Sequence, residues 1–410
     1  MKKLLIFSAL LIYTNSVFSQ RFEDYFEDRT LRLDYTFAGD DCLLQIYVDE
    51  LVSLPHWYGR REHLAELPLK GNGQITIRSK VDETVIYRHS FSTLFQEWLA
   101  TDEAKHVQKS FENVFLVPFP KDSVEIKVEL FDYHNEVVNS LTHTVDPKDI
   151  LIRKAGERGV TPYKVLNQAA DTTRCIHIAF VAEGYTEDEM DHYLDDCQKA
   201  IGSLFHHEPF KSMQDRFNII ALQSVSAESG TSEPAKGIWK NTVLGSHFDT
   251  FYSDRYLTTL HLKRLHDVLA GTPYEHIIIL VNTDHYGGGG IYNSYNLSYT
   301  GGKNFLPVVV HEFGHSFGGL GDEYGYGNDD PIYFNDTEPW EPNLTTKATA
   351  FIKWENLIKE GKAGLYEGGG YLEKGVWRGS ENCRMRTNEE PEFCAVCQEA
   401  LTKLIDFYTK

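Results

Sequence analysis

Short runs in which apolar and polar residues alternate fill the first third of the chain. A period of two places the apolar side chains on one face, which predicts strands half buried against a core. Turn-forming residues such as Gly71-Asn72-Gly73 separate the runs. We therefore expect an all-β sandwich of about seven strands over residues 20–150. Its predicted strands include residues 31–37, 42–48, 74–78, 84–88, 113–117 and 123–131.

After residue 170 the pattern changes to nearly continuous apolar runs separated by segments with helical spacing. Such runs predict strands covered on both faces, as in an α/β domain, here over residues 171–410. Thr186 and Glu189 form a capping box that starts one helix. Residues 151–170 mix glycine, proline and charged residues and are predicted to be a linker. The predicted strands cover 175–182, 217–222 and 276–281, and the predicted helices cover 187–205 and 253–269.

A glycine-rich segment, Tyr286 to Tyr299, follows these elements. Gly287 to Gly290 allow close backbone approach, and polar residues then recur at alternate positions. The segment predicts an edge strand, where an extended peptide can add as a further strand. A flexible glycine loop followed by an ordinary hairpin is an equally acceptable interpretation.

Two histidines four residues apart lie in the segment His311-Glu312-Phe313-Gly314-His315. On a helix these two positions share one face, so both imidazoles can reach one metal ion. Glu312 follows the first histidine and can hold a metal-bound water molecule. This is the H-E-x-x-H pattern of zinc sites in which the glutamate is the general base.

The flanking residues support a helix at this position. Asn304 is a suitable N-cap, Pro307 suits a first helical turn, and Gly318-Gly319 ends the helix just past the second histidine. Catalytic zinc usually has three protein ligands and an open position for water, and we predict Asp322 as the third ligand. A structural site closed by four ligands, often cysteines, is not expected because no cysteine is near in the sequence.

Length, composition and charge indicate how many domains the chain has and which classes of partner it does not suit. A chain of 410 residues is too long for one ordinary domain, so two are expected. Its composition, 41% hydrophobic and 24% charged, is that of a folded soluble protein. The formal net charge of −20 argues against nucleic acid or an anionic membrane as the main partner.

The N-terminus has the pattern of a signal peptide over residues 1–19. Lys2-Lys3 precede an apolar stretch, and Val17-Phe18-Ser19 is a suitable cleavage site. A membrane anchor is less favoured because the apolar run is short and interrupted by polar residues. We expect an exported chain that is periplasmic, cell-surface or extracellular.

Six cysteines remain after this segment, and export permits disulfides. Three of them cluster near the C-terminus, which predicts one local bridge from Cys383 to Cys394 or Cys397. The C-x-x-C spacing of Cys394 and Cys397 also suits redox chemistry or zinc binding, which we weigh below a structural bridge.

The buried sheet, edge strand, H-E-x-x-H helix and glycine break together resemble the metzincin zinc proteases. Within that group, three segments are similar to the IgA peptidase family: His311–Tyr324, Asn382–Arg386 and Phe393–Gln398. The resemblance covers about residues 170–410, and the preceding sandwich resembles that family's N-terminal domain. It carries no expectation about the substrate.

The resemblance implies roles for single residues. His311 and His315 match the helical zinc ligands, and Glu312 matches the catalytic base. Gly318 matches the glycine that turns the chain. Met385 matches the methionine of the turn beneath the metal, which supports the histidines by packing.

The third ligand departs from the usual metzincin spacing. Most metzincins place it where this chain has Gly321, whereas Asp322 follows one residue later and resembles the ligand of the IgA peptidase family. Glu323 is the neighbouring alternative. Tyr324 either polarises the substrate carbonyl or packs beside the site.

These features predict a secreted zinc endopeptidase that acts on a protein or peptide. Zn²⁺ held by His311, His315 and Asp322 would activate water, with Glu312 transferring a proton from that water to the leaving amine. One alternative is a glycan- or protein-binding protein with a vestigial protease domain, which has little need of Glu312. Another is an amidase of cell-wall peptides, which substrate profiling would separate from a protease. Further polar candidates near the cleft are Arg255, Asp284, His285 and Arg386.

Overall fold

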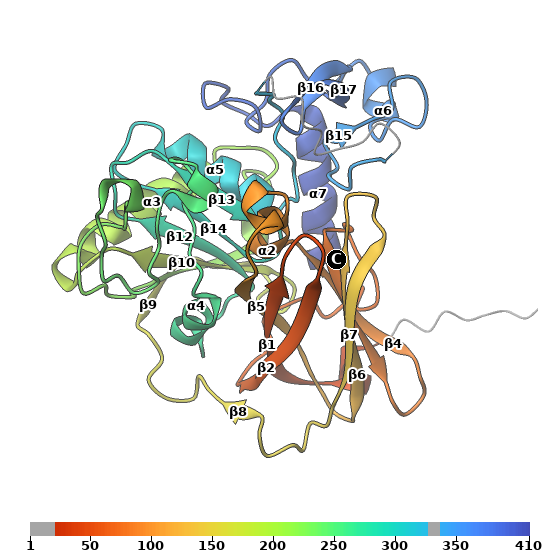
Figure 1. Ribbon diagram of the computed structural model, residues 1–410, viewed down its shortest axis with the longest axis vertical. Helices are drawn as coiled ribbons and strands as arrows, with labels where there is room; N and C mark the ends of the chain where they lie inside the picture. Colours follow the sequence, from red (N-terminus) through yellow and green to blue (C-terminus); the bar gives the residue numbers. More distant parts are fainter. Residues whose placement is uncertain (1–20, 327–336) are drawn as a thin grey trace, which may run out of the picture.

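The computed structural model describes residues 21–326 and 337–410 (Figure 1). The predicted signal peptide, residues 1–19, lies outside the described residues. A strand-rich N-terminal region is followed by a six-stranded α/β region and a smaller C-terminal part. No helix within the described ranges is long and apolar enough to cross a bilayer.

Two four-stranded sheets pack face to face in the N-terminal region, in the orders β5-β1-β2-β8 and β4-β3-β6-β7. Apolar residues alternate with polar ones along β3 and β6, and the apolar ones are buried. Aromatic rings fill the space between the sheets, with the Phe91 and Phe115 centroids 4.2 Å apart. The six strands delimited from the sequence are confirmed within a few residues, and β7 and β8 are additional. The strands are β1 Phe26–Gly39, β2 Leu44–Leu54, β3 Gly73–Ser79, β4 Val85–Phe91, β5 Lys109–Pro120, β6 Val124–Phe131, β7 Val137–Val145 and β8 Arg153–Lys154, with short helices α1 Phe22–Tyr25 and α2 Leu94–Leu99.

The central sheet has the order β13-β14-β12-β10-β11-β9. Strands β14, β12, β10 and β11 run parallel, and the two edge strands are antiparallel to their neighbours. The predicted strands 217–222 and 276–281 have the same bounds as β11 and β12, because each is a continuous apolar run buried on both faces. The strands are β9 Tyr163–Asn167, β10 Ile176–Glu183, β11 Phe217–Leu222, β12 His276–Val281, β13 Gly288–Ile291 and β14 Tyr295–Tyr299.

Alternate residues of the central strands enter two different cores. One face packs against α3 Met190–Leu204, α5 Phe305–Ser316 and α7 Ala395–Thr409. The other face packs against α4 Leu262–Leu269 and is continuous with the core of the sandwich. The sheet is therefore covered on both faces, and the two regions share one apolar interior.

The two predicted helices differ in outcome. The capping box of Thr186 and Glu189 is present and starts a 3₁₀ turn that continues into α3. The predicted helix over residues 253–269 is wrong in its first half, since α4 begins only at Leu262. Backbone pairing of Tyr256 with Gly288 and of Thr258 with His247 holds that first half extended. Helical spacing in the sequence was overridden by tertiary backbone hydrogen bonds.

The C-terminal part contains a small antiparallel sheet of order β15-β17-β16 and the long helix α7. In Figure 1, α7 runs from this part down to the sandwich. At its lower end Phe407 stacks on His63 of the sandwich, with ring centroids 5.1 Å apart. The other elements of this C-terminal part are β15 Leu344–Thr345, α6 Glu355–Lys359, β16 Tyr366–Gly369 and β17 Leu372–Arg378.

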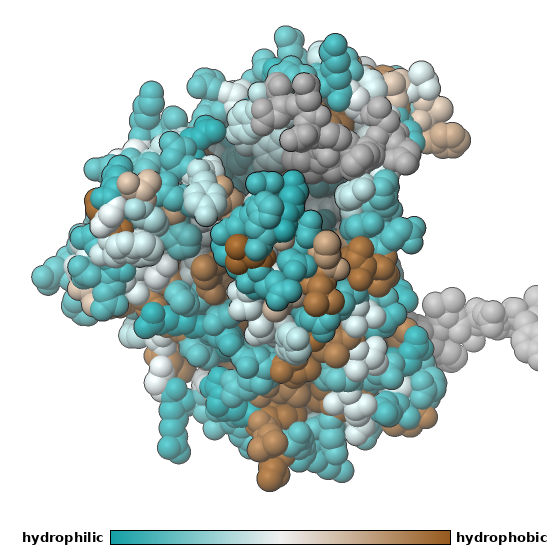
Figure 2. Space-filling view, in the orientation of Figure 1, coloured by the Kyte–Doolittle hydropathy of each residue, from teal (hydrophilic) through white to brown (hydrophobic). Residues whose placement is uncertain are grey.

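Part of the predicted linker, residues 151–170, takes part in both sheets. Strand β8 pairs with β2 of the sandwich, and β9 pairs with β11 of the central sheet. Figure 2 shows a largely hydrophilic face, with hydrophobic side chains gathered over the lower, sandwich end. The hydrophilic face agrees with the excess of acidic residues in the chain.

Candidate active site

Helix α5 carries both histidines of the H-E-x-x-H segment. Asn304 occupies the N-cap position, although its side chain makes no capping hydrogen bond. Gly319 ends the helix in the left-handed conformation, with φ of +57°. The Gly319 N–H donates to the His315 carbonyl (2.9 Å) and the Leu320 N–H to the Gly314 carbonyl (3.1 Å), so residues past the helix satisfy two carbonyls of its last turn. The chain therefore turns back towards the histidines directly after the helix.

Backbone carbonyls fix the orientation of both imidazoles. His311 Nδ1 lies 3.0 Å from the Arg384 carbonyl oxygen, and His315 Nδ1 lies 2.6 Å from that of Leu320. A carbonyl oxygen only accepts, so each Nδ1 carries the proton and donates it. In the neutral imidazole the remaining nitrogen, Nε2, is then an acceptor. The Nε2 lone pairs of His311 and His315 therefore point into the same small space.

Asp322 completes a cluster of three acceptor atoms. His311 Nε2 and His315 Nε2 are 3.0 Å apart, and Asp322 Oδ1 lies 3.1 and 3.3 Å from them. Within the described residues, the buried Asp322 Oδ1 has no hydrogen-bond donor. Zinc with bonds of about 2.0–2.1 Å to nitrogen and oxygen would have tetrahedral edges of about 3.3 Å. These three residues thus fit a zinc ion.

Close contact among these three side chains also shifts the pKa values of His315 and Asp322 in the metal-free chain. Burial lowers the pKa of His315, but the Asp322 carboxylate outweighs it and raises that pKa to about 9. Burial opposes ionisation of Asp322, yet the two imidazoles bring its pKa well below the usual range. A cation is therefore favoured at this position, whether a proton or a metal ion.

Tyr371, at the β16–β17 turn, holds the other oxygen of Asp322. Its hydroxyl donates to Asp322 Oδ2, and the Gly370 N–H donates to the Asp322 carbonyl (2.7 Å). Tyr371 adopts a left-handed backbone with φ of +65°, which is rare for a bulky residue. Tyr371 was not predicted as a site residue, because its only local signal is the preceding run Gly368–Gly370.

Glu312 lies against the glycine strand β13. A Cβ on Gly288 would come within 2.6 Å of Glu312 Oε1, and one on Gly290 within 2.5 Å of the Glu312 carbonyl oxygen. Only glycine at these positions leaves room for the carboxylate. Burial raises the pKa of Glu312, with the neighbouring histidines acting in the opposite direction. A raised pKa suits a group that accepts and returns a proton.

Strand β13 is the edge of the central sheet and forms a hairpin with β14, so the glycine-rich segment contains both the predicted edge strand and the hairpin of the alternative interpretation. The edge is not wholly open, because the Gly288 N–H donates to the Arg255 carbonyl (3.3 Å) and the Leu257 N–H donates to the Gly288 carbonyl (3.2 Å). Gly290, two residues further along, presents its backbone to the same side. The part of the edge beside Glu312 and His315 thus begins where the 255–257 segment ends.

Met385 lies beneath α5. A Cβ on Gly314 would come within 2.6 Å of Met385 Sδ, so the glycine within the H-E-x-x-H segment permits close contact. Met385 is fully buried and shares a core with Phe313 and Phe317. The turn therefore supports the helix by packing, and its Arg384 carbonyl orients His311.

The other polar candidates lie elsewhere. In the described ranges, Arg255, Asp284, His285 and Arg386 make no hydrogen bond or ion pair with the histidines or Asp322. His285 Nδ1 instead lies 2.6 Å from Glu233 Oε2. Tyr324 packs against Tyr326 and Tyr371, with ring centroids 5.2 and 5.6 Å away.

The N-terminal region also reaches the site, which the sequence analysis did not predict. Glu97 of α2 accepts a hydrogen bond from the Tyr256 hydroxyl. Burial raises the pKa of Glu97 to about 7, and its carboxylate interacts electrostatically with His315, Asp322 and Glu312. In Figure 1, α2 lies beside α5.

The predicted disulfide from Cys383 to Cys394 or Cys397 is wrong. All six cysteines are free thiols, and Cys383 Sγ lies 3.7 Å from Cys397 Sγ. No cysteine was expected near the predicted zinc ligands. In the structure, however, Cys397 Sγ lies 3.2 Å from Oε1 of Glu323, the residue that follows Asp322. Glu323 points to these thiols and Asp322 to the histidines.

Comparison with known families assigns both regions of the chain. Residues 165–363 and 359–405 match the sequence pattern of the IgA peptidase M64 family. Residues 21–142 match that of the peptidase M64 N-terminal domain. No curated protein matches the chain.

Proposed function

The chain belongs to the IgA peptidase M64 family, and we propose that it is a zinc-dependent endopeptidase with a metzincin-like site. Family membership makes it a peptidase that acts on proteins or peptides. The metal, the roles of single residues and the metzincin likeness are our proposal. The observation that carries it is the convergence of two imidazole nitrogens and one carboxylate oxygen within 3.3 Å of one another.

His311, His315 and Asp322 would hold the zinc ion. Bound there, zinc supplies a Lewis acid and lowers the pKa of a water molecule towards neutrality. Three ligands would leave the fourth position of a zinc ion for water, as catalytic zinc requires, and the described residues add no further ligand to this cluster. The carbonyls of Arg384 and Leu320 and the hydroxyl of Tyr371 hold these side chains in orientation.

Glu312 would act as the general base and then the general acid. Its carboxylate interacts electrostatically with both histidines and lies beside β13. It would accept a proton from the attacking water and return it to the leaving nitrogen of the cleaved peptide. Burial, which raises its pKa, favours acceptance of the proton from the attacking water.

The free part of the β13 edge would bind the substrate as an extended strand. Gly290 lies next to His315 and Glu312, so a peptide paired with it would pass the proposed metal position. The segment 255–257 occupies the edge at Gly288 and would limit the length of that pairing.

We also propose the domain division and destination expected from the sequence. Residues 20–150 would form the sandwich domain and residues 171–410 the peptidase domain, with 151–170 between them. The signal peptide would export the chain to the periplasm, cell surface or exterior.

The test is peptide cleavage by the purified full-length chain with a diverse peptide library read by mass spectrometry. Cleavage is expected in buffer, is expected to stop with a zinc chelator, and is expected to return when zinc is added in excess. The His311→Ala/His315→Ala chain is the matched control for a contaminating protease. Cleavage that survives the chelator, or equal cleavage by the control, would refute the zinc mechanism.

A further inference from the structure

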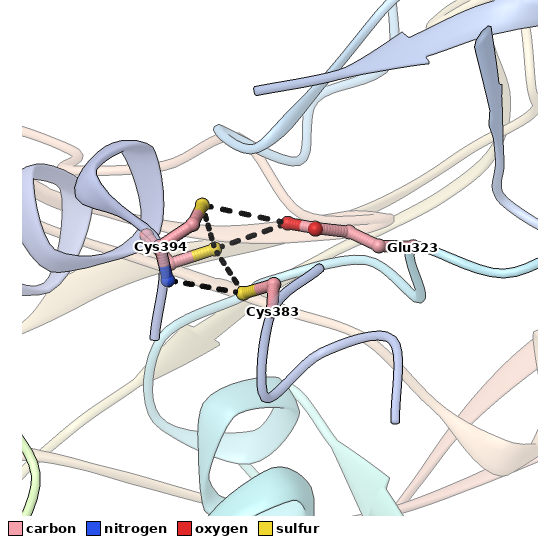
Figure 3. A group of neighbouring side chains, drawn as sticks. Glu323, Cys383 and Cys394 are labelled. Atoms are coloured by element: carbon pink, nitrogen blue, oxygen red, sulfur yellow. Dashed lines mark hydrogen bonds between the residues drawn. The ribbon is translucent and has the colours of Figure 1, made fainter. Parts of the chain in front are cut away.

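A second cluster of metal-binding side chains lies on the other side of the Asp322–Glu323 peptide bond. Glu323, Cys383, Cys394 and Cys397 each offer a donor atom, and these atoms all lie within 4.8 Å of one another. Figure 3 shows the cysteine sulfurs and the Glu323 carboxylate turned towards one common point. Glu323 comes from the segment that follows α5, whereas the three cysteines lie within residues 383–397.

The spacing of the donors is that of a tetrahedral zinc site. Cys397 Sγ lies 3.7 Å from both Cys383 Sγ and Cys394 Sγ, and tetrahedral zinc with bonds of about 2.3 Å to sulfur has edges of about 3.8 Å. Glu323 Oε1 lies 3.2 Å from Cys397 Sγ and 4.0 Å from Cys394 Sγ. With a zinc–oxygen bond of about 2.1 Å, the expected sulfur–oxygen edge is about 3.6 Å, midway between these distances.

The surroundings suit a charged cluster rather than a simple apolar pocket. The Cys394 N–H donates to Cys383 Sγ (3.2 Å), the kind of hydrogen bond that stabilises a thiolate. Glu323 is fully buried, and its Oε2 has no hydrogen-bond donor among the described residues. Arg378 interacts electrostatically with Glu323 and Cys383, and so offsets negative charge there.

Local backbone structure places the two paired cysteines. Cys394 is the N-cap residue of α7, and Cys397 lies one turn into the helix. Positions three apart share one helix face, so both sulfurs point to the same side. Cys383 belongs to the turn that also contains Met385.

We propose that Cys383, Cys394, Cys397 and Glu323 bind a second zinc ion in a closed, structural site. Four protein ligands leave no position for water, so this ion would not take part in the reaction. It would tie the start of α7 and the methionine turn to the segment that follows α5. Thiolate ligands favour zinc over calcium or magnesium, which prefer oxygen.

The site formed by Glu323 and the cysteines would help to position the histidine site. Asp322 precedes Glu323 directly, the Glu323 N–H donates to the Met385 carbonyl (2.9 Å), and the Arg384 carbonyl orients His311. Fixing Glu323 and Cys383 therefore restrains two parts of the histidine site. This inference does not rest on the proposed peptidase activity, since its readouts are metal content, absorption and thiol number.

The first experiment is elemental analysis of the full-length His311→Ala/His315→Ala chain, isolated without added metal. It is expected to retain about one zinc ion, whereas the wild-type chain carries about two. Replacing zinc by cobalt in this variant is expected to give the intense near-ultraviolet absorption of a thiolate-to-cobalt charge transfer, which imidazole and carboxylate ligands do not produce. Absence of both signals would overturn the proposal.

Cysteine replacements added to the His311→Ala/His315→Ala chain identify which thiolates give the cobalt absorption. Cys394→Ser/Cys397→Ser is expected to abolish the cobalt–thiolate absorption, and Cys42→Ser, an exposed cysteine of the sandwich, is expected to leave it unchanged. If the paired replacement does not fold, thiols are counted in the otherwise unaltered chain after unfolding in chelator without reductant. All six cysteines are expected to react; two fewer would reveal a disulfide and overturn the proposal.

Discussion

Two clusters of ligand-type side chains meet at one peptide bond, and they differ in how the chain builds them. The first, His311, His315 and Asp322, comes from one helix and the turn that follows it. The second brings Glu323 together with cysteines 60 to 74 residues further along the chain. A cluster built by local geometry is visible in the sequence, whereas one built by tertiary folding is not.

The adjacent carboxylates show the same contrast in their electrostatics. In the metal-free chain, the imidazoles overcome the effect of burial and lower the pKa of Asp322. Burial, reinforced by Cys394, raises the pKa of Glu323 to about 8. Neighbouring positions on one backbone thus carry opposite shifts, because alternate side chains of the extended segment face different partners.

The largest expected difference comes from removing one cluster at a time. His311→Ala/His315→Ala is expected to reduce peptide hydrolysis to the background rate, because it removes two of the three proposed ligands of the catalytic metal. Cys394→Ser/Cys397→Ser is expected to lower the melting temperature while retaining measurable hydrolysis. Cleavage rates and thermal unfolding of the two chains decide this. Hydrolysis by the histidine variant, with none by a folded cysteine variant, would reverse the assignment of roles.

The next comparison removes the carboxylates of Asp322 and Glu323 one at a time. Asp322→Ala is expected to weaken metal binding at the histidine site by at least ~100-fold, the upper range for disturbing a ligand's support, since a ligand itself is lost. Glu323→Ala is expected to affect that site less and the cysteine site more. Chelator competition, with cobalt absorption to distinguish the sites, measures both. The opposite order would make Glu323 the third ligand.

A pH series sharpens the difference between the clusters. The metal-free His315 has a pKa raised to about 9, so it is protonated at pH 7 and must lose that proton when it binds zinc. Affinity at the histidine site is therefore expected to rise about tenfold per pH unit from pH 7 to 9 and to level off above. Competition with a chelator of known pH dependence measures this. An affinity independent of pH over that range would contradict the protonated state.

The smallest predicted effect concerns Tyr371. Tyr371→Phe removes the hydroxyl that donates to Asp322 Oδ2 and is expected to lower zinc affinity at the histidine site about 10-fold. Tyr326→Phe is the matched control, because its ring stacks on Tyr371 but its hydroxyl does not contact Asp322. Equal effects of the two replacements would show that packing of the rings matters rather than the hydrogen bond.

Elements with strong local patterns were predictable. Continuous apolar runs gave β11 and β12 to the residue, and the cap and glycine signals gave α5 with its turn. The helix predicted from residue 253 was half wrong, because pairing of Tyr256 and Thr258 with distant backbone is not encoded in local spacing. Periodicity describes what a segment prefers alone, and tertiary hydrogen bonds overrode that preference here.

Prediction of the site had the same limit. His311, Glu312, His315 and Asp322 were identifiable because 12 consecutive positions contain them all. Tyr371 and Glu97 reach the site from a distant hairpin and from the sandwich, and no local pattern other than the glycine run before Tyr371 marks them. The cysteines were noticed but paired with one another, since no sequence signal connects them to Glu323.

One replacement at Glu312 separates catalysis from metal binding. Glu312→Gln keeps the size and hydrogen bonding of the side chain but removes the base. We expect unchanged zinc content and melting temperature, with peptide hydrolysis reduced by at least ~10²–10⁴-fold. All three would be measured on one preparation, using a peptide that the wild-type chain cleaves. Hydrolysis near the wild-type rate, with zinc still bound, would contradict the account.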